Sequence, residues 1–226
     1  MPPFHQHRRK PETEHRQLPP FEALRSDDLV ASVAAALLPT AAVASRCTAC
    51  ELSKTRTTVV FGAGSARSGI VFIGEAPGAQ EDAEGIPFVG RSGQLLDRML
   101  AATGIRRDDV YICNVVKCRP PANREPRPEE AAACARFLRA QLDALRPRVF
   151  CALGLHAARW LFPTKLAMAK LRGRVMDYNG IPTLATYHPA ALLRSPGLKP
   201  KAWEDFKLLR SVAEAAASRE LQSDGA

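Results

Sequence analysis

The sequence predicts an α/β fold in which a mostly parallel sheet lies between helices. Three short apolar runs, at residues 70–73, 110–116 and 149–153, have the length and composition of buried strands. Helical segments separate these runs, and strands that alternate with helices are typical of a parallel-rich sheet with helices on both faces. The 226 residues are enough for one domain with a sizeable core.

The helical segments carry start and stop signals. Residues 92–103 are followed by Gly104, a common C-terminal stop. Residues 128–145 begin with a proline and two glutamates, which suit the positive end of the helix dipole. Further helices are expected at residues 154–162 and 203–217.

A hairpin is expected after these elements. Residues 174–178 and 183–187 flank Asn179-Gly180, a dipeptide typical of tight hairpin turns. Because Pro182 has no backbone N–H to donate, the second run is predicted to be an edge strand or a short strand.

The N-terminal residues differ in composition from the rest of the chain. Residues 1–20 are rich in Pro, Arg and His with few apolar side chains, so we expect a disordered basic tail before a single domain at residues 21–226. His5, His7 and His15 lie in this tail, where a solvated role is favoured over metal binding. The formal charge of +9 favours a polyanionic partner, above all nucleic acid.

Residues 29–44 superficially resemble a signal peptide but are better explained as an amphipathic helix. Glu22 and Asp27 place acid where a signal peptide needs base, and Pro39 interrupts the apolar run. Ser26 or Asp27 is available as the N-cap. The run is predicted to be too short and too interrupted to span a membrane, and we expect a cytoplasmic protein.

The six cysteines fall into two groups. Cys113 and Cys151 lie inside apolar runs and are expected to be buried core thiols. The other four are candidate metal ligands: Cys47, Cys50, Cys118 and Cys134. Four thiolates suit structural zinc or an iron–sulfur cluster, and their spacing leaves both open. A redox CxxC would leave two of the four unexplained, and disulfides are a poorer explanation without a secretory signal.

The loop after residues 70–73 has the composition of a binding site. It contains two glycines, a proline and three carboxylates within nine residues: Gly74, Glu75, Ala76, Pro77, Gly78, Glu81 and Asp82. In open α/β sheets, ligands bind outside the carboxyl ends of the strands, where this loop is expected to lie.

Four motifs together resemble those of the family-4 uracil-DNA glycosylases, the iron–sulfur branch of the uracil-DNA glycosylase superfamily. They are GEAPG at 74–78 with Glu81 and Asp82, GIPFVG at 85–90, NVVKCRPP at 114–121 with Asn123 and Arg124, and HPAALLR at 188–194. The resemblance covers roughly residues 46–213. It implies a three-layer α/β/α fold with a four-stranded, mostly parallel central sheet. It also implies a structural [4Fe–4S] cluster on Cys47, Cys50, Cys118 and Cys134.

The activity implied by the resemblance is hydrolysis of the N-glycosidic bond between uracil and deoxyribose, which leaves an abasic site. The base must be flipped out of the DNA to be reached. His188 matches the catalytic histidine, a donor to uracil O2. Asn123 is the candidate for positioning the attacking water, and Glu75 contributes a backbone amide on the O2 side.

The remaining pocket residues are also assigned by the resemblance. Phe88 is the stacking face, and the amide of Asn114 reads the O4 and N3–H edge that distinguishes uracil from cytosine. Glu81 is expected beside C5, where it would exclude the methyl group of thymine. The full predicted pocket comprises Gly74, Glu75, Ala76, Glu81, Phe88, Asn114 and His188.

A DNA-binding surface is expected around the last motif. A leucine from the pair Leu192 and Leu193, on a loop, would wedge into the base stack while Arg194 contacts phosphate. Further candidate phosphate contacts are Arg91, Lys117, Arg119 and Arg124. We expect a monomer whose partner is uracil-containing DNA, single- or double-stranded.

Two departures and two rival functions complete the sequence-based hypothesis. Ala76 stands where the best-known branch of the superfamily has an aspartate, so no carboxylate is assigned as general base. The histidine insertion of a covalently trapping branch is absent between Cys118 and Pro128, which predicts turnover. The rivals are a non-catalytic iron–sulfur DNA-binding module and a zinc-stabilised nucleotide-binding enzyme, although the latter lacks a glycine fingerprint.

Overall fold

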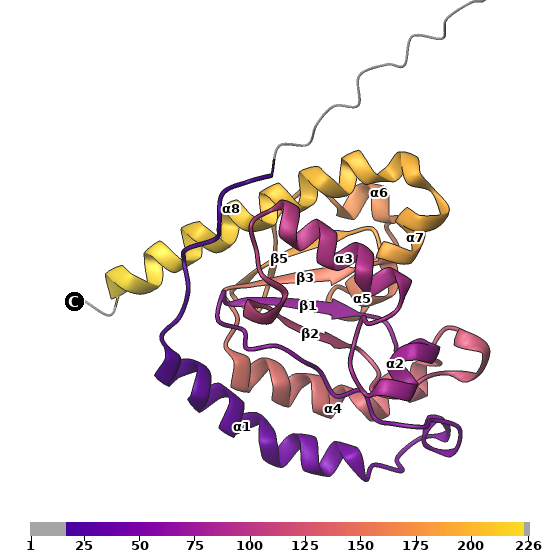
Figure 1. Ribbon diagram of the computed structural model, residues 1–226. Helices are drawn as coiled ribbons and strands as arrows, with labels where there is room; N and C mark the ends of the chain where they lie inside the picture. Colours follow the sequence, from indigo (N-terminus) through magenta and orange to yellow (C-terminus); the bar gives the residue numbers. More distant parts are fainter. Residues whose placement is uncertain (1–16, 224–226) are drawn as a thin grey trace, which may run out of the picture.

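The computed structural model describes residues 17–223 and contains one mixed sheet of five strands in the order β2-β1-β3-β5-β4 (Figure 1). The strands are β1 (Ile70–Gly74), β2 (Tyr111–Asn114), β3 (Val149–Leu153), β4 (Met176–Tyr178) and β5 (Ile181–Thr186). β1, β2, β3 and β5 are parallel, and β4 pairs antiparallel with β5 at the edge. The predicted fold class and the three predicted strand runs are therefore confirmed.

The sheet has five strands and not the predicted four, because the chain turns at Asn179-Gly180 and β4 pairs with β5 at the edge. The prediction of an edge position for the strand containing Pro182 is also wrong, since β5 pairs with both β3 and β4. Pairing with β3 begins only at Thr183, so Pro182 faces β4 alone. The proline is tolerated because it precedes the doubly paired part of the strand.

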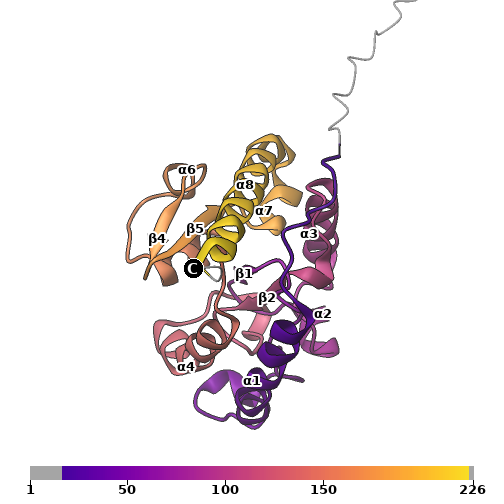
Figure 2. The same ribbon diagram turned by 90° about the vertical axis from the view of Figure 1, so that its left-hand side faces the viewer.

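Helices cover both faces of the sheet. They are α1 (Asp27–Ser45), α2 (Ala79–Glu84), α3 (Arg91–Ala102), α4 (Pro128–Leu145), α5 (Leu155–Leu161), α6 (Met168–Leu171), α7 (Pro189–Arg194) and α8 (Lys199–Ser223). Short 3₁₀ turns lie at η1 (Glu51–Lys54), η2 (Arg107–Asp109), η3 (Pro121–Asn123) and η4 (Pro196–Leu198). Figures 1 and 2 place α1 and α4 on one side of the sheet and α3 and α8 on the other.

Alternating side chains of the buried strands supply the two halves of the core. Val71 and Ile73 of β1 pack with the cluster that includes α4 and α5, while Phe72 points to the opposite face. There Phe72 stacks on Phe206 of α8, with ring centroids 5.7 Å apart. Because successive side chains of a strand point to opposite faces of the sheet, one continuous apolar run packs against both helical layers.

Helix α1 differs from its prediction. Ser26 caps it, as one of the two expected candidates, but Pro39 lies inside a continuous helix and does not interrupt it. Packing along α4, which buries Val33 and Leu37, outweighs the bond that the proline removes. By length and composition α1 is apolar enough to cross a membrane, contrary to the prediction that the run is too short and too interrupted. This is weak evidence, because the buried core helix of a soluble protein and an N-terminal signal sequence pass the same test.

The folded part begins before the predicted boundary at residue 21. The N–H of Leu18 donates to the carbonyl of Ala102, and the N–H of Phe21 donates to that of Gly104. Arg25 is buried and donates to the carbonyl of Leu145 at the end of α4. Residues 17–20 therefore belong to the domain. The rest of the predicted tail, including its three histidines, lies outside the described residues.

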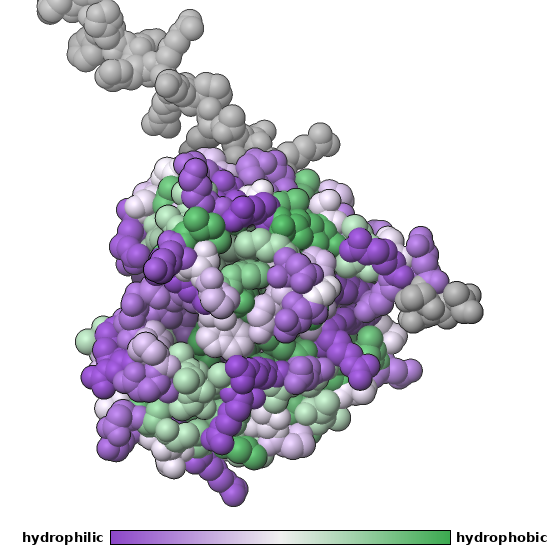
Figure 3. Space-filling model, turned by 180° about the vertical axis from the view of Figure 1, so that it is seen from behind, coloured by the Kyte–Doolittle hydropathy of each residue, from purple (hydrophilic) through white to green (hydrophobic). Residues whose placement is uncertain are grey.

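The face seen from behind, toward which α6 and β4 lie, mixes hydrophilic and hydrophobic residues (Figure 3). Exposed apolar side chains near these elements include Leu166 and Val175. Scattered exposed apolar residues are normal for a protein surface. This face therefore calls for no special function.

The stacked pair of Phe72 and Phe206 provides a test of the layer between the sheet and α8. Phe206→Ala is expected to lower the free energy of unfolding by about 3–5 kcal/mol, because it leaves a cavity beneath a fully buried strand residue. Urea denaturation measures this change. The control Lys207→Ala removes a surface pair with Glu204 and should cost less than about 1 kcal/mol. Equal losses in the two variants would contradict the assignment.

Candidate active site and thiol cavity

A cleft of about 660 Å³ opens at the carboxyl ends of the parallel strands. Glu75 follows β1, Asn114 ends β2, Gly154 follows β3, and His188 comes two residues after β5; all four line the cleft. β2, the next strand along the chain, lies on one side of β1, and β3 lies on the other side of β1, so the strand order reverses at β1. The cleft lies at this reversal. Open α/β sheets bind ligands at this position.

Asn114, Phe88 and Gly74 form a tightly packed part of the cleft. Asn114 is 1% exposed, and its Oδ1 is buried without a hydrogen-bond partner in the described part of the chain. A Cβ on Gly74 would lie 2.3 Å from Asn114 Oδ1 and 2.8 Å from the Phe88 ring. Glycine is therefore required here for both side chains to pack against this backbone position. A buried acceptor without a partner costs about 1–3 kcal/mol, which marks it as a position for a ligand donor.

The position of Phe88 is held by its backbone surroundings. Phe88 has φ +54°, a left-handed conformation that is unfavourable for an aromatic residue. The N–H groups of Val89 and Gly90 donate to Glu81 Oε1 at 3.0 and 2.9 Å, and the N–H of Gly78 donates to Glu81 Oε2 at 3.1 Å. The bonds that these N–H groups donate to a single carboxylate hold the strained turn in place.

These bonds give Glu81 a structural role. The residue lines the cleft, as predicted, but both carboxylate oxygens accept bonds from backbone N–H groups. These bonds join the start of α2 to the turn that carries Phe88. The position of Glu81 beside C5 of the base stays a prediction.

His188 is the N-cap of α7. Its Nδ1 accepts a bond from the N–H of Ala190 at 3.1 Å, so the proton of the neutral imidazole lies on Nε2. Its ring packs beside that of Phe88 with centroids 5.5 Å apart. Burial, followed by the nearby charge of Arg194, lowers the pKa of His188 to about 4. The residue is therefore a neutral N–H donor at physiological pH.

A second histidine, His156, lies in the cleft. His156 Nε2 contacts Glu125 and lies 4.0 Å from Glu75 Oε2. Burial raises the pKa of Glu75, and the nearby His156 opposes that rise. The sequence contained no signal for this grouping, because the three residues lie on separate segments.

Asn123 also lines the cleft, as predicted. Asn123 has a left-handed φ of +53°, and the preceding residue, Ala122, has a left-handed φ of +52°. Its Oδ1 accepts a bond from Arg119 Nε at 2.8 Å, so the amide oxygen is already engaged by a neighbouring side chain. The amide nitrogen is the group that Asn123 can offer to a ligand or a water.

Comparison with known proteins supports the arrangement. The family model described as the Uracil DNA glycosylase superfamily matches residues 61–207. The chain belongs to the uracil-DNA glycosylase superfamily. It is 51% identical to a type-4 uracil-DNA glycosylase of Thermotoga maritima over 74% of this chain and 88% of the relative. A type-4 enzyme of Archaeoglobus fulgidus is 46% identical, over 71% and 85%. These relatives confirm the predicted type-4 membership.

The four cysteines predicted as ligands in this type-4 member line one small cavity between α1, η1 and α4. In the described part of the chain, no three or more His, Cys, Asp or Glu side chains group closely enough to hold a single metal ion. Cys113 and Cys151 are buried in the core, as predicted. The four thiols thus surround a shared space without converging on one point.

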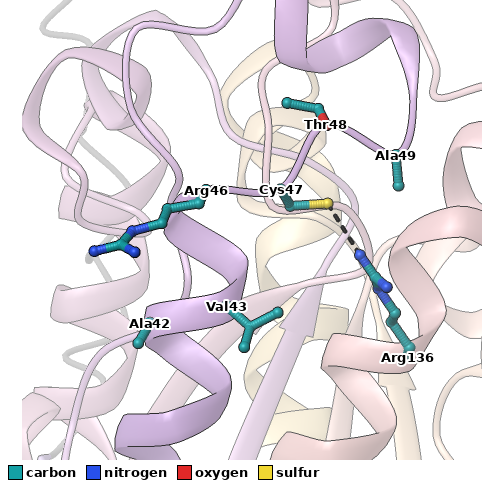
Figure 4. Close-up of a pocket in the computed structure, with 7 residues that line it drawn as sticks. All are labelled: Ala42, Val43, Arg46, Cys47, Thr48, Ala49 and Arg136. Atoms are coloured by element: carbon teal, nitrogen blue, oxygen red, sulfur yellow. Dashed lines mark hydrogen bonds between the residues drawn. The ribbon is translucent and has the colours of Figure 1, made fainter.

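Nitrogen donors point at three of these four sulfurs. Arg56 donates to Cys118 Sγ, Arg136 donates to Cys47 Sγ, and the N–H of Lys117 donates to Cys134 Sγ, each at 3.3 Å. Figure 4 shows the Arg136 contact at a surface hollow of about 590 Å³ beside the end of α1. Burial raises the pKa of Cys118 and of Cys134, and the donors from Arg56 and Lys117 oppose that rise.

Two of the predicted DNA contacts are contradicted by burial. Lys117 is 1% exposed, and its Nζ donates to the carbonyl of Asn114 at 2.8 Å, so it cannot reach a phosphate. Leu192 is fully buried beside Leu95, and the predicted loop around it is the helix α7. The apolar motif that suggested a wedge serves here as the packing face of a helix.

The other residues predicted to contact DNA differ in their exposure and in the bonds that their side chains already make. Arg91 and Arg194 are exposed, and Leu193 is half-buried. Arg119 is engaged with Asn123, and Arg124 makes a two-pronged pair with Glu130 at 2.6 and 2.8 Å. Arg91 and Arg194 are thus the most available cations of the set, and their contact with DNA stays a prediction.

The titration of His188 is a direct test of the site geometry. NMR of the imidazole nitrogens should show a pKa of about 4 and Nε2–H as the neutral tautomer. The ordinary value is about 6.5, so stability from the neutral ring is complete above about pH 6.5 and is lost as the pH falls toward 4. A pKa of about 6.5 in the folded protein would contradict this environment.

Proposed function

We propose that this chain is a DNA repair glycosylase that flips uracil out of DNA and hydrolyses its N-glycosidic bond. The observation that carries the proposal is the buried, unpartnered Oδ1 of Asn114 between Gly74 and Phe88. Uracil N3–H is a donor that matches this acceptor, whereas cytosine presents an acceptor at N3. The base stacks on Phe88, with its edge toward Asn114.

His188 supports the departure of the base. As the bond between C1′ and N1 breaks, its electron pair moves onto uracil, and negative charge develops at O2. The neutral His188 donates from Nε2 to this oxygen, and a donor fixed in advance costs no reorganisation as the charge develops. Glu75, with its backbone amide, and Asn123 line the same cleft, and we propose that Asn123 positions the attacking water.

A non-catalytic DNA-binding module is the weaker alternative. The type-4 relatives, at 42–51% identity over most of this chain, bear the names of glycosylases. Arg91 and Arg194 provide phosphate contacts beside the cleft, and Leu193 is the remaining candidate for a wedge.

We further propose a monomer that acts in the cytoplasm.

We propose that Cys47, Cys50, Cys118 and Cys134 hold a [4Fe–4S] cluster. The donor set fits, since four thiols line one cavity and three receive N–H donors. Four thiols at one cavity suit zinc or a cluster, and the resemblance to the iron–sulfur branch of the superfamily favours the cluster. The cluster, when bound, supplies structural cross-links between α1, the segment after β2, and α4. The chemistry of excision belongs to the residues of the cleft.

Uracil excision is tested with a uracil-containing oligonucleotide followed by alkaline cleavage of abasic sites. The wild-type protein should produce a strand break at the uracil. Gly74→Ala should reduce the excision rate by at least about a hundredfold, because the methyl group displaces Asn114 and Phe88. The control Gly197→Ala places its methyl group in open space and should retain activity. Binding without cleavage by a cluster-loaded wild type would favour the alternative.

The cluster is tested by iron and sulfide analysis. The wild-type protein should contain about four irons and four sulfides per chain. Cys134→Ser should lose most of both, while Cys151→Ala, at a buried thiol outside the cavity, should retain them. One zinc per chain without sulfide would contradict the cluster.

A further inference from the structure

His156 links three segments of the cleft that are far apart in the sequence. It lies in the first turn of α5, Glu125 lies in the segment between η3 and α4, and Glu75 lies directly after β1. One imidazole nitrogen contacts the Glu125 carboxylate and lies 4.0 Å from that of Glu75. The same imidazole nitrogen therefore faces two carboxylates, one from each of two other segments.

We propose that His156, paired with Glu125, is a positioning residue that keeps the Glu75 carboxylate ionised and oriented for water activation. The inference rests on the proposed excision of uracil. As C1′–N1 breaks and its electron pair leaves on uracil, the water oxygen bonds to C1′. The proton released by the water passes to the Glu75 carboxylate. Ala76 cannot accept this proton, and the carboxylate of Glu81 is bonded to backbone N–H groups.

The electrostatics of the cleft supports this assignment. Glu75 has a side chain that is 27% exposed, and burial raises its pKa, which would favour the protonated form. The positive charge of His156 lowers the pKa of Glu75, and Glu125 raises it. His156 therefore opposes the effect of burial on the Glu75 carboxyl, in the direction that favours its ionised form.

The other charged or titratable groups around the cleft have different partners. They are Glu81, Arg124, Tyr187, His188 and Arg194. Arg124 is paired with Glu130, and Arg194 acts on His188, whose pKa it lowers. His156 is thus the cationic side chain placed against Glu75.

The test is the pH dependence of single-turnover uracil excision by the cluster-loaded full chain. In His156→Gln the acid limb of the pH–rate profile, where excision slows as the pH falls, should move to higher pH by about one unit. At a given pH on that limb, excision should then be about tenfold slower. His156→Lys keeps the charge and should restore the limb toward that of the wild type. The control Arg159→Gln removes a cation from an exposed position of the same helix and should not move the limb.

The outcomes separate the inference from the proposed function. If the wild type excises no uracil, the proposed function fails and the inference fails with it. If the wild type is active and His156→Gln keeps the wild-type acid limb, the inference alone is overturned. His156→Ala, a favourable helix residue, is the second variant if the glutamine protein does not fold. In a Glu75→Gln background, loss of His156 should cause no further shift, and an additional shift would also overturn the inference.

Discussion

The cleft depends on one steric constraint, the absence of a side chain at Gly74. Parallel strands bring their carboxyl ends to one edge, and Asn114 and Phe88 pack so closely on Gly74 that a Cβ there would lie 2.3 Å and 2.8 Å from them. Phe88 must in turn adopt a left-handed backbone conformation. The rest of the site is arranged to hold this close approach, since Glu81 binds the turn around Phe88 and His188 packs beside its ring.

The three carboxylates of the loop after β1 have three different functions in the structure. Glu81 holds the Phe88 turn, and the buried Asp82 accepts bonds from the N–H groups of Thr57 and Thr58, which joins the cysteine-bearing segment to α2. Glu75 alone keeps its carboxylate within reach of a histidine in the cleft. Acidic residues that look alike in the sequence therefore divide into two structural anchors and one candidate for chemistry.

Lys117 connects the thiol cavity to the cleft. Its backbone N–H donates to Cys134 Sγ, and its buried ammonium donates to the carbonyl of Asn114. Burial lowers the pKa of Lys117, and the nearby Cys113 and Cys134 oppose that shift. Lys117 thus bonds to a thiol of the cavity on one side and to the backbone of a cleft residue on the other.

The sequence by itself determined the fold class, the strands β1 to β3, most helices, the separation of the cysteines into four that line one cavity and two core thiols, and the family. These features follow from local periodicity and from residue types in a fixed order. Only the tertiary structure decided that Lys117 and Leu192 are buried, that Glu81 is engaged, and that His156 faces Glu75. These outcomes depend on which segments meet at the sheet edge, and contacts between residues distant in sequence leave no periodic pattern to read.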